Sequence, residues 1–218
     1  MAEPSSETIT QKPRIPMLKH APQTTEETRR SLKWRVVDIA VGAAVGVMSG
    51  VMFWVFDGMS YGLFPLLTLI LPGSAALLHA LFYFPATLGL LIVRKPGVSA
   101  YVLLVASFVE VVLGTKYSVS LVVIALVQAL AAETVFAVFR YRRWTLGVTL
   151  LSSVAIGIVY NFYLLFFYYQ AFSFFSPRGL IGTACELLSA IVFAGFGSWI
   201  LYRALAKSGV LTRFVSGR

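Results

Sequence analysis

Cysteine, histidine and acidic residues are scarce in this chain, which has one Cys, two His and nine Asp or Glu among 218 residues. Cys185 alone cannot form an internal disulfide, and no Cys/His cluster offers a metal site. The nucleotide-binding pattern G-x-x-x-x-G-K-[ST] and the zinc pattern H-E-x-x-H are absent as well. We therefore expect no enzymatic activity, metal or cofactor. If the protein takes part in a process driven by ATP hydrolysis, a partner protein must supply the ATPase.

Charged residues make up only 12% of the chain, and long apolar runs take their place. Hydrophobic residues account for 58%, and the mean hydropathy of +0.82 lies outside the range of soluble globular domains. The length suffices for about six bilayer spans of ~20 residues each. We predict an all-α integral membrane protein with six transmembrane helices, at residues 36–56, 75–93, 98–113, 119–139, 146–167 and 180–205.

One further apolar segment, residues 61–71, is too short to cross a bilayer. It contains Pro65 and is followed by Pro72 and Gly73, which disfavour a continuing helix. The pattern predicts a short extracellular half-helix between the first and second transmembrane helices, capping the outer side.

Lysine and arginine are unevenly distributed along the chain. They gather before the first span, between spans two and three, between spans four and five, and at the C-terminus, so the positive-inside rule predicts that both termini are cytoplasmic. This topology explains the pI near 9.9 without a nucleic-acid partner. Residues 1–33 are rich in Pro, Ser, Thr and Gln and indicate a disordered cytoplasmic tail. The membrane domain is expected at residues 34–211, and residues 212–218 form a second tail.

Several polar residues lie inside the apolar spans, where an unpaired carboxylate is costly and is therefore a candidate for function. Helical rise of ~1.5 Å per residue places four of them, on four spans, in the outer half or near the midplane. These are Glu110, Gln128, Asn161 and Glu186. Their similar depth predicts a polar site that opens to the outside.

Glu133 does not join this group easily. It lies seven residues before Arg140, close to the cytoplasmic side, and about 140° around the helix from Gln128. A scaffolding hydrogen bond or ion pair between helices and a ligand contact both remain open for Glu133.

Aromatic residues crowd the same outer region, with ten in the sixteen positions 160–175. An interfacial aromatic belt explains most of them. Flat rings near a carboxylate also suit a planar, cationic or amino-bearing heterocycle, so some rings are candidates for a ligand pocket. His79 lies in the outer part of the second span as a packed or pocket-edge hydrogen-bonding residue.

Small residues form a stripe along the first span, where close approach of another helix is possible. The stripe consists of Ala40, Gly42, Ala44, Gly46 and Gly50. Packing within the chain and docking of a partner helix both fit this spacing.

Five motifs are shared with a known family. They are LIVRKPG at residues 91–97, E-V-V-L-G at 110–114, Q-A-L-A-A-E at 128–133, RYRRW at 140–144 and AKSGVL at 206–211. Together they resemble the YkoE group of substrate-binding S components of energy-coupling factor (ECF) transporters, over roughly residues 34–211.

The resemblance implies capture of thiamine or its precursor hydroxymethylpyrimidine from outside, in a bacterial cytoplasmic membrane. It also implies a membrane-embedded coupling subunit, on which the first helix docks, and two ATPase subunits that use ATP. The candidate substrate-binding residues are Glu110, Glu186, Gln128 and Asn161 as polar contacts, Phe82, His79 and Tyr160 as shaping or stacking groups, and Glu133 as part of the motif.

The chain departs from the group's pattern at some positions. Phe82 stands in place of an expected tryptophan, Leu103 in place of a glutamate, and Ala129 and Ala131 in place of glycines. The carboxylate missing at Leu103 bears on the selectivity for the ligand and not on the family resemblance. A proton-coupled carrier and a membrane assembly subunit without a ligand remain the alternatives.

Overall fold

The computed structural model describes residues 32–115, 119–170, 173–209 and 211. The chain divides into two units, Met1–Ser31 and Leu32–Arg218, and the first lies outside the described residues. Almost all of the two expected tails lies outside them too. The described part is helical, with α2 at Val36–Ile70, η1 at Ser74–Phe82, α3 at Phe84–Val93, α4 at Val98–Val112, α5 at Val119–Val138, α6 at Leu146–Phe167, α7 at Pro177–Ser189, η2 at Ala190–Gly197 and α8 at Ser198–Lys207.

Among the described residues, five helical segments are long and apolar enough to cross a membrane. They are Val36–Ile70, Ser74–Val93, Ser120–Val138, Leu146–Phe167 and Pro177–Lys207. The predicted all-helical, multi-pass membrane protein is thereby confirmed. The remaining expected span, residues 98–113, corresponds to α4, which is apolar but has only 15 residues, so the six crossings and their orientation stay predictions.

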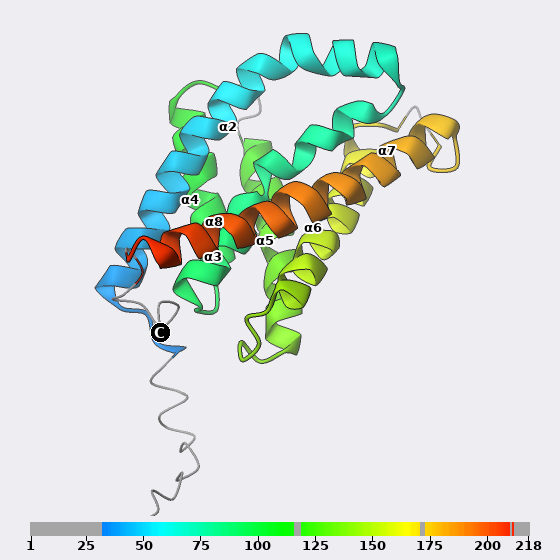
Figure 1. The fold of residues 1–218 in the computed structure, drawn as a ribbon. Helices are drawn as coiled ribbons and strands as arrows, with labels where there is room; N and C mark the ends of the chain where they lie inside the picture. Colours follow the sequence, from blue (N-terminus) through cyan, green and yellow to red (C-terminus); the bar gives the residue numbers. More distant parts are fainter. Residues whose placement is uncertain (1–31, 116–118, 171–172, 210, 212–218) are drawn as a thin grey trace, which may run out of the picture. The chain divides into compact units, whose positions relative to one another are not determined.

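The prediction of a separate half-helix at residues 61–71 is wrong. Residues 61–71 continue α2, which runs for 35 residues through Pro65 and bends so that its last part crosses the top of the bundle (Figure 1). Pro65 has no N–H, so it removes one intrahelical hydrogen bond and bends the helix without ending it. The helix ends before Pro72 and Gly73, where Gly73 adopts a φ of 97° that favours glycine.

The stripe of small residues on α2 faces two ways. Gly42, Gly46 and Gly50 are buried against α4, and a Cβ on Gly46 would lie 2.7 Å from Val105. These three glycines are therefore occupied by packing within the chain and are not open to a partner. Ala40 and Ala44 are exposed, so only they remain candidates for docking.

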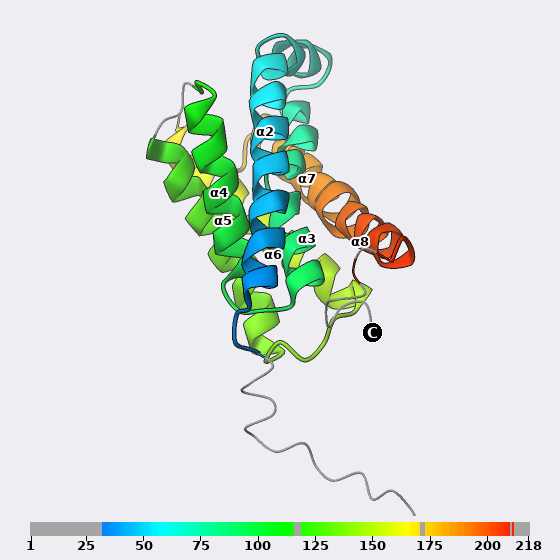
Figure 2. The ribbon, with the colours of Figure 1, turned by 90° about the vertical axis from the view of Figure 1, so that its left-hand side faces the viewer.

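The second and the sixth expected spans contain irregular helix. The second begins as the 3₁₀ helix η1 before α3, and the last contains the π-helical η2 between α7 and α8. Thr87 on α3 donates to the Ala194 carbonyl oxygen of η2 at 2.9 Å, which provides a partner for a backbone group in the irregular turn. The helix α7–η2–α8 crosses the bundle obliquely, on the side of α2 opposite α4 and α5 (Figure 2).

The basic loops meet at one end of the bundle. Trp34 Nε1, before α2, donates to the Pro96 carbonyl oxygen at 3.0 Å. Arg94 donates to the Tyr202 hydroxyl at 2.9 Å and lies over the Trp144 ring at 5.5 Å from its centre. These contacts join the start of α2, the α3–α4 loop, the α5–α6 loop and α8. The predicted cytoplasmic side therefore corresponds to one physical end of the domain.

Candidate functional site

A cavity of about 310 Å³ lies between α2, η1, α4, α5 and α6, away from the basic end. We call it the inner chamber. Its volume is at the lower limit of the ~300–1,000 Å³ range of small-molecule sites. Its lining residues are Phe53, Asp57, Ser60, Phe64, His79, Phe82, Leu103, Ser107, Glu110, Leu121, Ile124, Ala125, Gln128, Tyr160, Leu164, Tyr168 and Tyr169.

Two polar side chains of the inner chamber lack partners. Glu110 on α4 and Gln128 on α5 are each 2% exposed. Within the described residues, Gln128 Nε2 has no hydrogen-bond partner, and Glu110 accepts no hydrogen bond. A buried donor or carboxylate without a partner costs free energy in the empty protein. Both groups are therefore available to a ligand that supplies the missing partners.

Asp57 on α2 is a second carboxylate in the same chamber. It is 7% exposed, and the Thr115 hydroxyl donates to its Oδ2 over a long 3.4 Å. None of the described residues that line this chamber is Lys or Arg. Two carboxylates beside one cavity repel each other. A ligand with a positive charge or with hydrogen-bond donors would reduce that repulsion.

Aromatic rings form the walls of the inner chamber. Phe53 and Phe82 approach with ring centres 5.7 Å apart, and the His79 and Tyr160 rings lie at 5.6 Å, edge to face. These side chains come from α2, η1 and α6. The chamber can therefore hold a flat heterocycle between apolar faces, with its polar edge turned to the acidic groups.

Glu186 lies behind this wall and fixes one of its members. Its Oε2 lies 2.6 Å from His79 Nδ1, and its Oε1 accepts from the Tyr83 hydroxyl at 2.8 Å. When Glu186 is ionised, the Nδ1 proton of His79 points to it, and Nε2 is left for a ligand. Glu186 is fully buried and lines neither of the two cavities, so it positions His79 and is not placed to contact a ligand directly.

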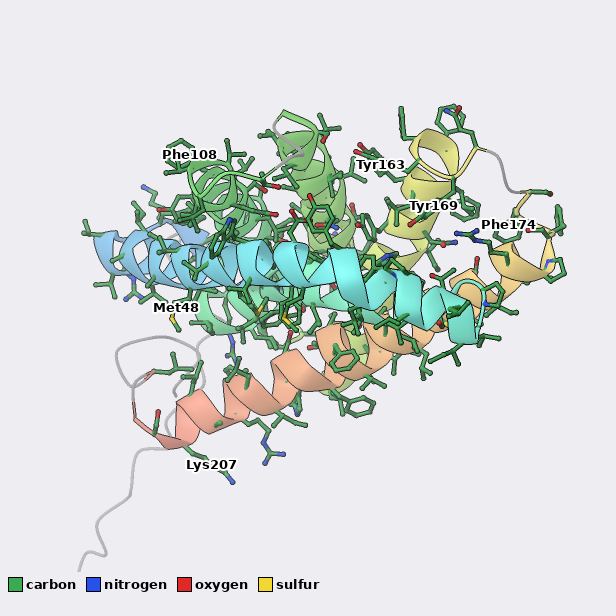
Figure 3. The ribbon with its side chains drawn as sticks, turned by 90° about the horizontal axis from the view of Figure 1, so that it is seen from above. Met48, Phe108, Tyr163, Tyr169, Phe174 and Lys207 are labelled. Carbon is green, nitrogen blue, oxygen red and sulfur yellow. The ribbon has the colours of Figure 1, made fainter. Side chains whose placement is uncertain are left out.

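A second cavity of about 360 Å³ adjoins the inner chamber, and we call it the outer chamber. Four side chains, Phe64, His79, Leu164 and Tyr169, line both chambers and divide them. Figure 3 shows Tyr169 at the end of α6. The remaining lining residues are Pro65, Thr68, Gly73, Ala75, Ala76, Asn161, Leu165, Arg178, Gly179 and Gly182.

The structure separates the eight predicted substrate-binding residues into groups. Five line the inner chamber, namely His79, Phe82, Glu110, Gln128 and Tyr160. Asn161 lines the outer chamber and donates to the Thr183 hydroxyl at 2.9 Å. Glu133 lines neither chamber, because it lies at the basic end, where it accepts from the Ser99 backbone N–H at 3.0 Å and the Tyr141 hydroxyl at 2.5 Å. The ligand-contact interpretation of Glu133 and Glu186 therefore disagrees with the geometry.

Sequence reasoning missed the contribution of α2. Phe53, Asp57, Ser60 and Phe64 line the inner chamber at spacings of four, three and four residues, which is one face of a helix. That spacing could have indicated one helical face. The predicted first span ends at Phe56, however, so Asp57, Ser60 and Phe64 fall outside that span. Ser60 also stands in the sequence Gly58-Met59-Ser60-Tyr61-Gly62, which matches the pattern G-x-S-x-G. Here the pattern lies within a helix, without the strand-to-helix turn that exposes a nucleophilic serine.

Comparisons with known proteins agree with this architecture. The family model described as "ABC-type cobalt transport system, permease component" matches residues 37–159, more than half of the chain. The putative HMP/thiamine permease protein YkoE of Bacillus subtilis (strain 168) is 25% identical over 189 residues, which cover 85% of this chain and 91% of that protein. A crystal structure of an S-component of an ECF transporter superposes with a TM-score of 0.76 at 25% identity, over 85% of this chain and 92% of the other.

These matches confirm the resemblance that the sequence motifs predict. The matched regions all lie in the helical membrane domain. The chain belongs to the family of ABC-type cobalt transport system permease components, and within it to the S components of ECF transporters, next to the YkoE group.

Proposed function

We propose that this S component binds thiamine or hydroxymethylpyrimidine on the outside of a bacterial cytoplasmic membrane. A coupling subunit and two ATPase subunits then use ATP to drive its delivery inward. Both termini are cytoplasmic, and the chambers open outward. The name of the relative YkoE supports this choice of substrate.

The observation that carries the proposal is the set of unpartnered polar groups in the inner chamber. An aminopyrimidine offers an exocyclic amine to a carboxylate and a ring nitrogen to an amide N–H. Glu110 and Gln128 Nε2 supply these two partners, and both are buried without one. Phe53 and Phe82 enclose the ring, and Asp57 balances the charge of a thiazolium.

Calorimetry on the purified full chain tests this proposal. Thiamine and hydroxymethylpyrimidine are expected to bind with one site each, and a free thiazole is expected to bind much more weakly because it lacks the aminopyrimidine. Absence of binding by both pyrimidine ligands would overturn the proposal. Co²⁺ belongs in the same series because the family description names cobalt. Within the described residues, no group of three or more His, Cys, Asp or Glu side chains is arranged to hold a metal ion.

A proton-coupled carrier is the second candidate, since Asp57 and Glu110 line one chamber and could exchange a proton. The two functions differ in what the chain does alone. A carrier takes up labelled thiamine into liposomes without other subunits, and uptake follows the pH gradient. An S component binds the ligand in liposomes but accumulates it only with the coupling and ATPase subunits and ATP.

Docking on the coupling subunit uses the exposed side of α2 in this proposal. Ala40 and Ala44 are exposed there, and Met48, at 76% exposure, lies on the side of α2 turned away from α4 (Figure 3). Ala44→Trp is expected to reduce co-purification with the coupling subunit by about tenfold or more, because a large ring prevents close helix packing. Ligand binding by the isolated chain should be unchanged. Leu130→Trp, on an exposed apolar position of α5, is the control and should leave co-purification intact.

A further inference from the structure

The two chambers differ in charge. Asp57 and Glu110 line the inner chamber, and among the described residues its lining contains no Lys or Arg. In the described part of the chain, the outer chamber has the opposite composition, with Arg178 and no Asp or Glu in its lining. A ligand that fills both chambers would therefore experience a negative environment at one end and a positive one at the other.

The residues that line both chambers, Phe64, His79, Leu164 and Tyr169, form the wall between them. His79 is fixed by Glu186, but Phe64 lies on the bent end of α2 next to Pro65, and Tyr169 follows the end of α6. The Phe64 and His79 ring centres lie 5.9 Å apart. Rotation of an aromatic side chain such as Phe64 or Tyr169 would connect the two spaces without moving a helix.

The outer chamber also offers hydrogen-bonding groups for a polar tail. Asn161 is 9% exposed, and its Nδ2 is bound to Thr183, which donates in turn to the Gly179 carbonyl oxygen at 2.9 Å. This chain of bonds orients the Asn161 amide, so that its Oδ1 remains as an acceptor for a hydroxyl or P–OH donor of the ligand, whereas the anionic oxygens require the positive charge of Arg178. Thr68 adds a hydroxyl to the same lining.

We propose that the outer chamber is a second subsite, which binds an anionic tail on a ligand whose aminopyrimidine occupies the inner chamber. The ligand class is a phosphate monoester of the thiamine type, with the phosphate next to Arg178. This inference rests on the proposed function, because the inner chamber must first hold the ring. The outer chamber then selects the length and charge of the tail.

Calorimetry with three probes tests the subsite in the full chain. Hydroxymethylpyrimidine reaches only the inner chamber, thiamine extends past its ring without an anion, and thiamine monophosphate adds the anion. Thiamine monophosphate is expected to bind at least as tightly as thiamine. Arg178→Gln should weaken thiamine monophosphate by about tenfold or more while it changes hydroxymethylpyrimidine by less than about twofold.

Two further variants separate a local effect of the outer chamber from a general effect of lost surface charge. Arg203→Gln removes the same charge from the exposed surface of α8 and should leave all three affinities unchanged. Thr68→Trp fills the outer chamber without adding or removing charge, so it should weaken thiamine monophosphate and thiamine but spare hydroxymethylpyrimidine. If Arg178→Gln misfolds, the Thr68→Trp affinities decide whether the ligand tail occupies the outer chamber.

The outcomes separate this inference from the proposed function. If hydroxymethylpyrimidine and thiamine bind but thiamine monophosphate does not, or if Arg178→Gln and Thr68→Trp affect all probes equally, the second subsite is overturned and the proposed function stands. If none of the three binds, the proposed function itself is overturned, and the subsite with it.

Discussion

Glu110 and Glu133 are the same residue type on two helices that pack together, yet their surroundings are opposite. Glu133 accepts hydrogen bonds from the Ser99 backbone N–H and the Tyr141 hydroxyl. Glu110 is 2% exposed and accepts none within the described residues. A buried carboxylate with its partners in place contributes to the scaffold, whereas one without them is held ready for a partner from outside the chain.

The basic end has more paired polar groups than the chamber end, although Arg94 Nε and the Ser99 hydroxyl there are also buried without a partner among the described residues. At the basic end, the hydroxyl of Tyr202 and the ring of Trp144 both contact Arg94. Burial, followed by the hydrogen bond to Glu133, raises the pKa of Tyr141 well above its usual range, so Tyr141 keeps its proton and remains a donor at physiological pH. At the chamber end, the polar groups of Glu110 and Gln128 point to no such contacts. The hydrogen-bonded groups stabilise the basic end, and the unpaired groups of the inner chamber are the ones for which we propose a ligand contact.

The largest expected effect comes from Glu110→Gln, which removes the free carboxylate with almost no change in shape. Thiamine affinity should fall by about 10- to 150-fold, since a hydrogen bond to a charged group contributes about 1.5–3 kcal/mol. Thermal stability of the empty protein should stay equal or rise, because an unpaired buried carboxylate is lost. Calorimetry and thermal unfolding of the same preparation measure both. Unchanged affinity would remove Glu110 from the site.

Glu133→Gln is the matched variant at the other end. It removes a paired carboxylate, so the free energy of unfolding should fall by about 1–3 kcal/mol. Ligand affinity of the folded fraction should stay within about twofold. Tyr141→Phe should cost a similar amount of stability, and the double variant should cost less than the sum, because both changes break one hydrogen bond. Loss of affinity without loss of stability would show instead that Glu133 contacts the ligand.

The sequence could predict where the helices are, because apolar runs and turn residues depend on local patterns. The start at Leu146 and the turn at Pro96 and Gly97 both appear where expected. The continuation of α2 through Pro65 was not predicted. Whether a proline such as Pro65 ends or bends a helix depends on how the following turns pack, and the sequence alone does not show that packing.

The candidate site was predictable in part for the same reason. Helical rise placed Glu110 and Gln128 at similar depth, and the structure brings both to one chamber. Depth could not separate Glu186 from them, because its partners His79 and Tyr83 lie more than 100 positions away in the sequence. Asp57 was missed because it comes just after the predicted end of a span. Pairing between distant residues is a tertiary property, and it decides which carboxylate is free.

The smallest expected effect concerns Gln128, whose Nε2 is buried without a partner. Gln128→Leu removes this donor and keeps most of the volume, so the stability of the empty protein should stay equal or increase. Ligand affinity should fall by about five- to tenfold, the value of one neutral hydrogen bond of ~1 kcal/mol. Ser152→Ala is the control, because the Ser152 hydroxyl is buried but already donates to the Ala132 carbonyl oxygen at 3.3 Å.

The two variants should change opposite quantities. Ser152→Ala loses an existing bond between α6 and α5, so it should lower stability and leave affinity unchanged. Gln128→Leu should lower affinity and leave stability intact. If Gln128→Leu is destabilised as much as Ser152→Ala and still binds the ligand normally, the Gln128 amide belongs to the scaffold. The contrast between paired and unpaired buried groups would then hold for the carboxylates alone.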